Sequence, residues 1–448
     1  MTETQINAMP TKAFFIDMLV KDIPLDRAVL DLVDNCIDGA KRLHREDNSN
    51  LSNLSDLKVD IRMDENRFEI VDNCGGFDVK TAQDYAFRFG KPAEANDTDY
   101  SIGQFGVGMK RALFKFGKYF EVHSTTRTQK WSMKVDVLQW ESSKEWVFNF
   151  EEISENHAHD ESARGTRIVV KKLRSEVASR FSDPQFQNRL SESIRSHQRQ
   201  FLRRGLNVVF QGAHLVNTDL RILSGDKFRP VVEIIPYEED TNNPINVRIV
   251  AGVGHPSPSE AGWYIVCNGR VILSADRTEE TGWNSIQRGE NGIPKYHNDF
   301  ARFRGVVFFE CRSSGKLPWN TTKTGIDSSS AIWQAVFLRM RNHTRTVIDF
   351  LKMLSNDVEE YGGQNHSPLH LALKNNTKAY EVEELTTLGS FSWDELPKTP
   401  GPKYTRIQYS RQEEMIEELK TALGVNSAKA VGEATFEMIY RQQVENGE

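Results

Sequence analysis

The stretch Ser101-Ile-Gly-Gln-Phe-Gly-Val-Gly-Met-Lys110 decides how this chain is interpreted. Its three glycines are spaced G-x-x-G-x-G, and glycine allows positive φ and close approach of the backbone. Such a run can direct its N–H groups toward phosphates. Lys110 follows where a helix is expected to begin, which adds a helix N-terminus and an ammonium group. A plain loop is the alternative, but ordering three glycines costs considerable conformational entropy.

An amphipathic helix is expected upstream, over Leu25–His44, because apolar residues recur there at steps of four, four and three: Val29, Val33, Ile37 and Ala40. Asp31, Asn35 and Asp38 occupy i, i+4 and i+7, so they share another face of this helix. An amide oxygen with flanking carboxylates suits Mg²⁺ and its bound waters. The alternative is an ordinary solvated polar face.

The segment Ile70-Val-Asp-Asn-Cys-Gly-Gly-Phe77 lies between the helix and the glycine-rich run. A strand over Arg67–Asp72 is expected to end in Asp72 and to run into Gly75-Gly76. A carboxylate at a strand end can accept a hydrogen bond from an exocyclic amine such as that of adenine, and the glycines leave room for a flat ring. An Asx turn before a loop is an equally good interpretation of this segment alone.

The first 200 or so residues predict an α+β layer, with helices on one face of a sheet. The expected strands are Leu57–Met63, Arg67–Asp72, Tyr119–Ser124, Lys130–Val137, Trp146–Glu151 and Thr166–Lys171, and the further expected helices are Ala82–Gly90 and Met109–Phe116. Lys91–Tyr100 is polar and without periodicity, which predicts a mobile loop.

A second unit is expected to begin near Leu206 and to be closed by a long helix, Ala331–Leu354. Its predicted strands are Leu206–Phe210, Val231–Ile235, Asn246–Val253, Gly262–Cys267 and Gly305–Glu310. Pro397, Pro400, Gly401 and Pro402 indicate a linker over Leu388–Lys403. Two tail helices are expected after it, Arg411–Leu423 and Ser427–Gln442.

Composition narrows the class of protein. The 448 residues predict two or three domains, and the net charge of −6 gives no global attraction to nucleic acid. No apolar run approaches the ~18 residues of a membrane helix, and the four scattered cysteines argue against zinc and disulfides, so a cytoplasmic protein is expected. Residues 160–204 hold 11 Lys or Arg and 5 Asp or Glu, a local charge of +6. This stretch predicts either a phosphate-backbone contact surface or a solvated helix face.

Together these segments resemble the GHKL superfamily of ATPases, which includes gyrase, the ninety-kilodalton heat-shock chaperone, histidine kinases and MutL. Asp31-Leu-Val-Asp-Asn-Cys-Ile-Asp-Gly-Ala40 is similar to its E-L-x-x-N-x-x-D-A box, and Asp72-Asn-Cys-Gly-Gly76 to its D-x-G-x-G box. Ile102–Gly108 is close to the chaperone's lid motif, the ending Gly-x-Gly-x-Lys resembles the MORC branch, and Gly165-Thr166 resembles the last box. The resemblance covers residues 10 to about 175 and implies the Bergerat ATP-binding fold.

The resemblance also implies roles for single residues. Asn35 would bind Mg²⁺, with Asp38 on the same helix; Asp72 would read adenine beside Gly76 and Phe77, and Thr166 would support the adenine end. The lid over the phosphates of ATP would consist of Gly103, Gln104, Phe105, Gly106, Val107, Gly108, Met109 and Lys110.

Residues 206–355 resemble the transducer domain of MutL, MORC and the topoisomerase VI B subunit, which has a ribosomal-protein-type βαβ fold. Tyr264-Ile-Val-Cys-Asn-Gly-Arg270 is similar to a MutL-type V-N-G-R strand. Such domains send one lysine to the γ-phosphate, and Lys323 is the candidate, with a solvated loop lysine as the alternative. The resulting division is an ATP-binding domain at 1–205, a transducer at 206–355, and a linker with a short helical tail at 356–448.

Two residues depart from the family's pattern. Asp31 stands where the family has a glutamate base, and it is one methylene shorter. Because a base must reach its water within about 3 Å, hydrolysis is expected to be slow, by ~10²–10⁴-fold if Asp31 cannot reach. Cys74 stands where the family usually has glycine, and its side chain either crowds the adenine pocket or is tolerated beside Gly75.

Four functions follow. The first is an ATPase that acts as an ATP-dependent homodimeric clamp on DNA or a partner protein. The second is an ATP-binding scaffold with little hydrolysis that regulates an effector; by analogy, some bacterial MORC-like and chaperone-like ATPases come from defence contexts. A histidine kinase is disfavoured because none of the 34 residues before Asn35 is His. A topoisomerase or mismatch-repair subunit would need more than the 93 residues after Ser355, or a partner.

Overall fold

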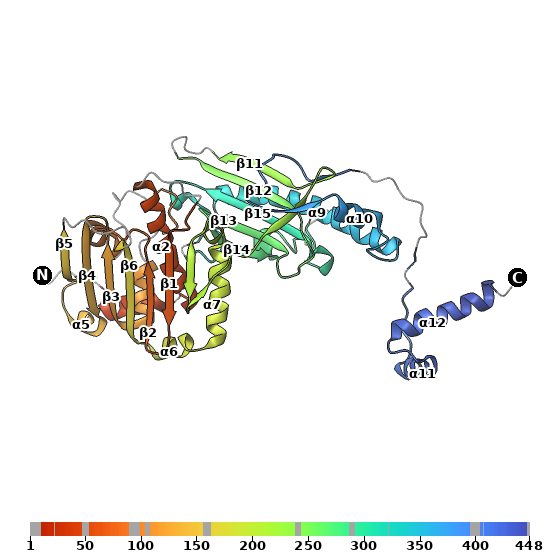
Figure 1. Cartoon of the computed structure of the whole chain (residues 1–448), viewed down its shortest axis with the longest axis horizontal. Helices are drawn as coiled ribbons and strands as arrows, with labels where there is room; N and C mark the ends of the chain where they lie inside the picture. The colour runs from red at the N-terminus through yellow and green to blue at the C-terminus, as the bar shows by residue number, and fades with distance from the viewer. Residues whose placement is uncertain are drawn as a thin grey trace, which may run out of the picture. The chain divides into compact units, whose positions relative to one another are not determined.

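A computed structural model describes residues 10–21, 23–46, 53–88, 99–103, 108–155, 163–237, 243–285, 292–320, 322–394, 404–405 and 407–445. Figure 1 shows the helices and strands of the chain, which divides into two compact units. The first comprises Met1–Leu354 with Ala372–Leu396, and the second comprises Ser355–Leu371 with Pro397–Glu448.

An eight-stranded sheet forms the first half of the large unit, in the order β5-β4-β3-β6-β2-β1-β7-β8. Its strands are β1 (Lys58–Met63), β2 (Arg67–Asp72), β3 (Gly117–Thr125), β4 (Gln129–Asp136), β5 (Phe150–Glu155), β6 (Gly165–Leu173), β7 (Asn207–Phe210) and β8 (Ala213–His214). Neighbours are antiparallel except β1 and β7, which run parallel. Burial alternates along β1 and β3, so one face of the sheet is packed and the other is exposed.

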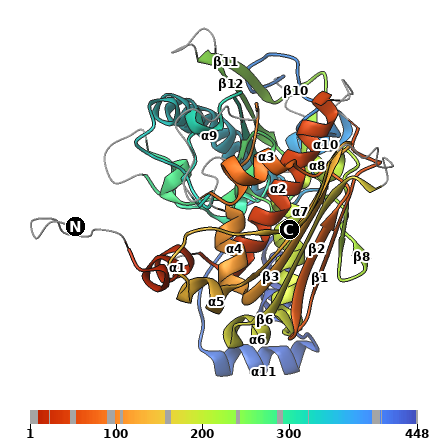
Figure 2. The ribbon, with the colours of Figure 1, turned by 90° about the vertical axis from the view of Figure 1, so that its left-hand side faces the viewer.

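Helices cover the packed face of this sheet, as Figure 2 shows for α2 and α4. The helices of this half are α1 (Lys12–Lys21), α2 (Leu25–Glu46), α3 (Val79–Thr81), α4 (Gly108–Phe116), α5 (Val137–Ser142), α6 (Ser175–Phe181), α7 (Pro184–His197) and α8 (Arg199–Arg203), with a π-helical turn at Ala82–Ala86. Phe68 of β2, Phe116 of α4 and Phe181 of α6 pack together in the core with ring centroids 4.8–5.7 Å apart. This packing holds α4 and α6 against β2.

A five-stranded sheet forms the second half of the large unit, in the order β11-β12-β15-β13-β14. Its strands are β11 (Val231–Tyr237), β12 (Ile245–Val253), β13 (Gly262–Cys267), β14 (Arg270–Asp276) and β15 (Phe303–Glu310), and β13 pairs parallel with β15. The long helix α9 (Ala331–Glu360) packs on one face, where Trp263 Nε1 donates to Thr344 Oγ1 at 3.0 Å. We call this sheet with α9 the second domain.

Residues 372–394, the returning segment, pack on part of the other face of the second sheet. Its strand β16 (Lys378–Glu381) pairs with β9 (Arg221–Ser224), and β17 (Ser392–Trp393) pairs with β10 (Phe228–Arg229). Val382 joins a buried cluster with Val250, Tyr264 and Phe308. This segment therefore contributes to the core of the second domain.

The small unit contains the tail helices α11 (Glu413–Leu423) and α12 (Ala428–Tyr440), and α10 (Pro368–Asn375) lies at the division of the units. Large apolar side chains are exposed on both tail helices, among them Met415, Leu419, Phe436 and Ile439. Among the described helices, none combines the length and hydropathy needed to cross a membrane.

Most expected elements are confirmed within a few residues, including α2, β2, α4, β13 and α9. Others differ from expectation, including the following. The strand assigned to the second unit, Leu206–Phe210, instead joins the first sheet as β7 beside β1. Trp146–Glu151 was expected to be a strand, but β5 begins only at Phe150, after the unexpected helix α5. The hairpin partner β14 was missed. Most of the predicted loop at 91–100 and of the linker at 388–403 lies outside the described residues.

Candidate functional site

The polar residues of α2 lie on a helix that is buried on most sides. Val29, Leu30, Val33 and Ile37 are fully buried, and so are the carboxylates of Asp34 and Asp38. Buried carboxylates need hydrogen-bond or ionic partners. The alternative of an ordinary solvated polar face is therefore wrong for Asp38, while Asp31 and Asn35 are half-buried.

Lys323, from the segment after β15, reaches α2 across 292 residues of sequence. Its Nζ lies 3.3 Å from Asp31 Oδ1 and 3.1 Å from Asp34 Oδ2. Burial of the ammonium opposes its charge, but the two carboxylates outweigh burial and raise the pKa of Lys323 above its usual value. The alternative of a solvated loop lysine is wrong, because Lys323 is buried in this ion pair.

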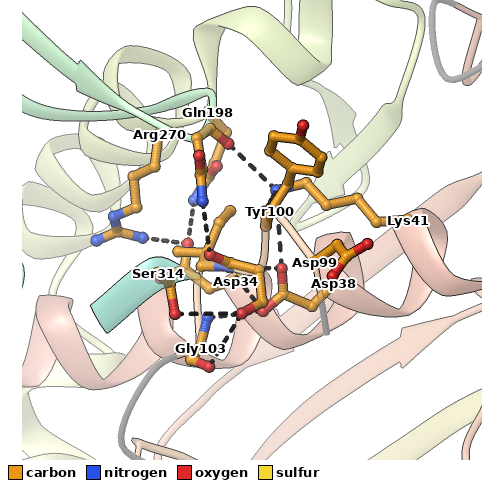
Figure 3. Close-up of polar contacts among 12 residues, drawn as sticks. Asp34, Asp38, Lys41, Asp99, Tyr100, Gly103, Gln198, Arg270 and Ser314 are labelled. Atoms are coloured by element: carbon orange, nitrogen blue, oxygen red, sulfur yellow. Dashed lines mark hydrogen bonds and ion pairs between the residues drawn. The ribbon is translucent and has the colours of Figure 1, made fainter. Parts of the chain in front are cut away.

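Asp34 is the centre of the charge cluster and is fully buried, with 0% of its surface exposed. Besides Lys323, its carboxylate accepts hydrogen bonds from Gln198 Nε2 at 2.7 Å and from Arg270 Nη1 (Figure 3). Burial would raise the pKa of Asp34, but Arg270 and Lys323 outweigh burial and lower it. The second domain thus supplies two cations to one carboxylate next to Asn35.

Asp34 was missed as a site residue, although it stands inside the quoted box. Leu30, Asp34 and Ile37 occupy i, i+4 and i+7, so a charged residue interrupts a buried stripe of the helix. That interruption was the available signal, because a charge on a buried face requires a partner. The sequence contained no comparable signal for Gln198.

The end of β2 holds the second group of candidates. Asp72 is paired opposite Thr166 in the antiparallel ladder, and its Oδ1 accepts from Thr166 N at 3.3 Å and from Cys74 N at 2.8 Å. Burial raises the pKa of Asp72 despite these hydrogen bonds. Gly165 has φ +151°, and a Cβ there would lie 1.8 Å from Asp72 O, so only glycine fits before Thr166.

The residues after Asp72 are fixed to the neighbouring strands. Phe77 N donates to Ser124 Oγ at 2.8 Å, and Phe77 O accepts from Trp131 Nε1 at 2.8 Å. Gly76, with φ +64°, provides the turn before Phe77. Cys74 is buried against α2, since a Cβ on Gly39 would lie 3.4 Å from its Cβ.

The ends of the glycine-rich run approach the polar face of α2. Asp38 accepts hydrogen bonds from Ile102 N at 2.8 Å and Gly103 N at 2.7 Å. A Cβ on Gly103 would lie 3.7 Å from Asn35 Oδ1, and one on Gly108 would lie 3.0 Å from Asp31 Oδ2. Gln104, Phe105, Gly106 and Val107 lie outside the described residues.

Met109 and Lys110 stand in the first turn of α4. Lys110 is buried, and its Nζ donates to Ala86 O at 2.8 Å. Burial lowers its pKa to about 7. The Lys110 ammonium thus has a backbone partner, and its assignment to the phosphates of ATP stays a prediction.

The side chain of Asn35 is chemically suited to bind Mg²⁺: its amide oxygen would be one ligand of the ion, and bound phosphates would supply others. Mg²⁺ keeps several waters and is usually held by one or two protein oxygens together with substrate phosphates. Asn35 supplies an amide oxygen near the backbone of Gly103. Within the described ranges no cluster of three His, Cys, Asp or Glu side chains is placed to hold a metal ion.

Part of the basic stretch at 160–204 is paired with acidic residues within the chain. Arg199 and Arg203 of α8 pair with acidic residues of the returning segment, Arg199 with Glu381 at 2.9 Å and Arg203 with Glu383 at 3.2 Å. Arg167 pairs with Glu69 at 2.7 Å. These pairs reduce the charge available to a phosphate backbone.

Comparison with known families gives one match. Residues 23–166 match a family model described as histidine kinase-, DNA gyrase B-, and HSP90-like ATPase. The matched range contains every candidate nucleotide-site residue named above except Lys323. No curated protein matches the chain. The match supports the GHKL superfamily for residues 23–166, and with it ATP binding by this domain.

Proposed function

We propose that the protein is an Mg²⁺-dependent ATPase that works as an ATP-gated, dimerising clamp on DNA or on a partner protein. The single observation that carries the proposal is the ion pair between Lys323 and Asp31, at 3.3 Å. It joins the matched domain to a lysine of the second domain at the position expected for the catalytic base. A nucleotide-dependent switch of this kind needs such a link between domains.

The proposed roles follow from the chemistry of each side chain. Asp72 accepts a hydrogen bond from the exocyclic amine of adenine, and its neighbours Cys74 N and Thr166 N orient the carboxylate. Asn35 provides the amide oxygen for Mg²⁺, which when bound neutralises phosphate charge. Asp31 takes a proton from the attacking water, and Lys323 offers its positive charge to the terminal phosphate.

A second candidate function is an ATP-binding scaffold with little hydrolysis that regulates an effector. One observation favours it: the short side chain of Asp31. Because aspartate is one methylene shorter than glutamate, its carboxylate reaches less far toward an attacking water.

The first experiment measures Mg–ATP binding by calorimetry and mass in solution by analytical ultracentrifugation. The clamp proposal expects binding and a doubling of mass with ATP or a non-hydrolysable analogue. Asn35→Ala is expected to abolish both, whereas Asn207→Ala in β7, away from the site, is the matched control. Absence of heat from the wild-type protein contradicts the proposal.

The second experiment separates the two functions. Turnover is compared for the wild type and Asp31→Glu, with and without duplex DNA. Robust wild-type turnover supports the ATPase clamp. A low wild-type rate with a large gain in Asp31→Glu supports the scaffold, and stimulation by DNA identifies DNA as the material on which the clamp acts.

A further inference from the structure

The hairpin turn between β13 and β14 is buried against the first half of the large unit. Cys267 pairs with Arg270, so Asn268 and Gly269 are the two turn residues, and both have positive φ, 48° and 89°. Asn and Gly are favoured in such two-residue turns. Turn residues of hairpins are usually solvated, yet Asn268 is only 6% exposed. Its burial shows that the turn has a packing partner.

That partner is the segment 99–103, which leads into the glycine-rich run. Asn268 Nδ2 donates to Ser101 O at 3.2 Å and to Cys311 O at 3.0 Å, while its Oδ1 accepts from Cys311 N at 3.0 Å. One amide side chain therefore ties Ser101 to the end of β15. Tyr100 N also donates to Arg312 O at 2.8 Å.

The same segment is held from the other side by α2. Lys41 Nζ donates to Tyr100 O at 2.8 Å and to Asn268 O at 3.1 Å, and Asp38 accepts from the backbone of Ile102 and Gly103 (Figure 3). The segment thus lies between α2 and the turn of the second domain. Its position is set by both, because each supplies hydrogen bonds to a different part of its backbone.

The position of this segment matters for Asn35. Gly103 is close enough that a Cβ on it would lie 3.7 Å from Asn35 Oδ1 and 3.2 Å from Asp38 Oδ2. A shift of the segment by about 1 Å would alter the space in front of Asn35, and misplacements of that size can cost 10²-fold in activity. The hydrogen bonds of Asn268 restrain that shift.

We propose that Asn268 is a positioning residue of the nucleotide site: it fixes segment 99–103 over Asn35 from the second domain, so that nucleotide affinity depends on where the β13–β14 turn sits. The inference rests on the proposed binding of ATP. By linkage, nucleotide binding must favour the docked turn to the same extent as the docked turn favours binding.

The test uses the full chain with Asn268→Asp and Asn268→Gly. Asp keeps the acceptor for Cys311 N and loses both donations, while Gly tolerates the positive φ and loses the whole side chain. Each is expected to weaken Mg–ATP binding in calorimetry about tenfold, because each removes the one Asn268 side-chain hydrogen bond that reaches the segment, to Ser101 O. Asn284, also with positive φ at 60°, is the matched control, and Asn284→Asp and Asn284→Gly should bind as the wild type.

Hydrogen exchange separates positioning from general destabilisation. In the nucleotide-free variants the amides of Ile102 and Gly103 should exchange faster, while the amides within β13 and β15 keep their protection. Unchanged affinity together with unchanged exchange at both amides overturns the inference. If the wild type binds no Mg–ATP, the proposed function fails, and the exchange experiment still decides whether Asn268 positions the segment. If Asn268→Asp does not fold, Asn268→Gly carries both measurements.

Discussion

The polar face of α2 and the outer face of the eight-stranded sheet both carry many charges, but they pair them differently. On α2, Asp34 is fully buried and its cationic partners, Arg270 and Lys323, come from the second domain. On the outer face, Lys171 pairs with Glu121 at 2.8 Å on the adjacent strand and stays 48% exposed. A buried charge needs an opposite charge beside it, because it has lost its hydration. An exposed ion pair contributes little, because both of its groups are also well solvated when they are apart.

The outer face also carries a cavity of about 460 Å³. It is lined by paired charges such as Arg62 with Asp60, and it reaches Asp72 at the end of β2. The cavity therefore reaches two residues of the candidate site, Asp72 and Thr166. The difference in energy between the buried pairs of α2 and the exposed pairs of the outer face can be tested by removing one charged side chain at a time.

The largest effect is expected from Asp34→Ala. Removal of this carboxylate leaves Arg270, which is 1% exposed, without its ionic partner, and weakens the hold on Lys323. Breaking a buried pair in this way costs about 3–5 kcal/mol in the free energy of unfolding. Urea denaturation measures the loss, with Asp60→Ala on the outer face as the control. A loss for Asp34→Ala no greater than that of the control would erase the distinction between the two faces.

The second-largest effect is expected from Lys323→Met, which should lower the rate of ATP turnover more than the free energy of unfolding. Its ammonium is the cation nearest Asp31, at 3.3 Å, and loss of one preorganised charge from a reaction site costs about 10²–10³ in rate. Single-turnover hydrolysis measures the effect, and Lys171→Met is the matched lysine control. Equal rates for wild type and Lys323→Met would place Lys323 outside the reaction and leave it a structural ion pair.

Buried His197, at the end of α7, should make the free energy of unfolding depend on pH. His197 is buried beside Arg270 and Arg27, and burial with these charges lowers its pKa to about 3. Because the unfolded histidine titrates near 6.5, the unfolded state binds more protons between about pH 6.5 and 3. The free energy of unfolding should therefore fall as pH falls through this range, by up to about 1.4 kcal/mol per pH unit.

His197→Gln is the control for that prediction. Glutamine can still donate to Ser193 O and accept from Arg27 as the neutral imidazole does, but it does not titrate. The slope of unfolding free energy against pH should become shallower in this variant. The same slope in both proteins would show that other groups control acid unfolding.

The smallest effect is expected from Lys171→Ala on the outer face. Exposed ion pairs contribute about 0.2–1 kcal/mol, and salt screens them. Denaturation at low and high salt should show a small loss that shrinks further as salt rises. A loss comparable to that of Asp34→Ala would mean that the outer face is not simply a solvated surface.

Periodicity was sufficient for the elements that build the site. The apolar stripe of α2, the short run of β2 and the start of α4 predicted their bounds to within two residues, because each element buries one continuous face. Periodicity failed for β7, whose four residues could pair with either sheet, since strand pairing is a long-range choice.

The amino-acid sequence by itself determined which residues carry the chemistry: an asparagine between carboxylates on one helix, an aspartate at a strand end, and glycines where the backbone must come close. Only the tertiary structure decided how these groups are charged and held. Asp34 becomes the centre of an ionic cluster, and Asn268 donates a hydrogen bond to segment 99–103. Both occur because folding brings together residues more than 160 positions apart. A local pattern contains no information about such partners, and burial then makes those partners obligatory.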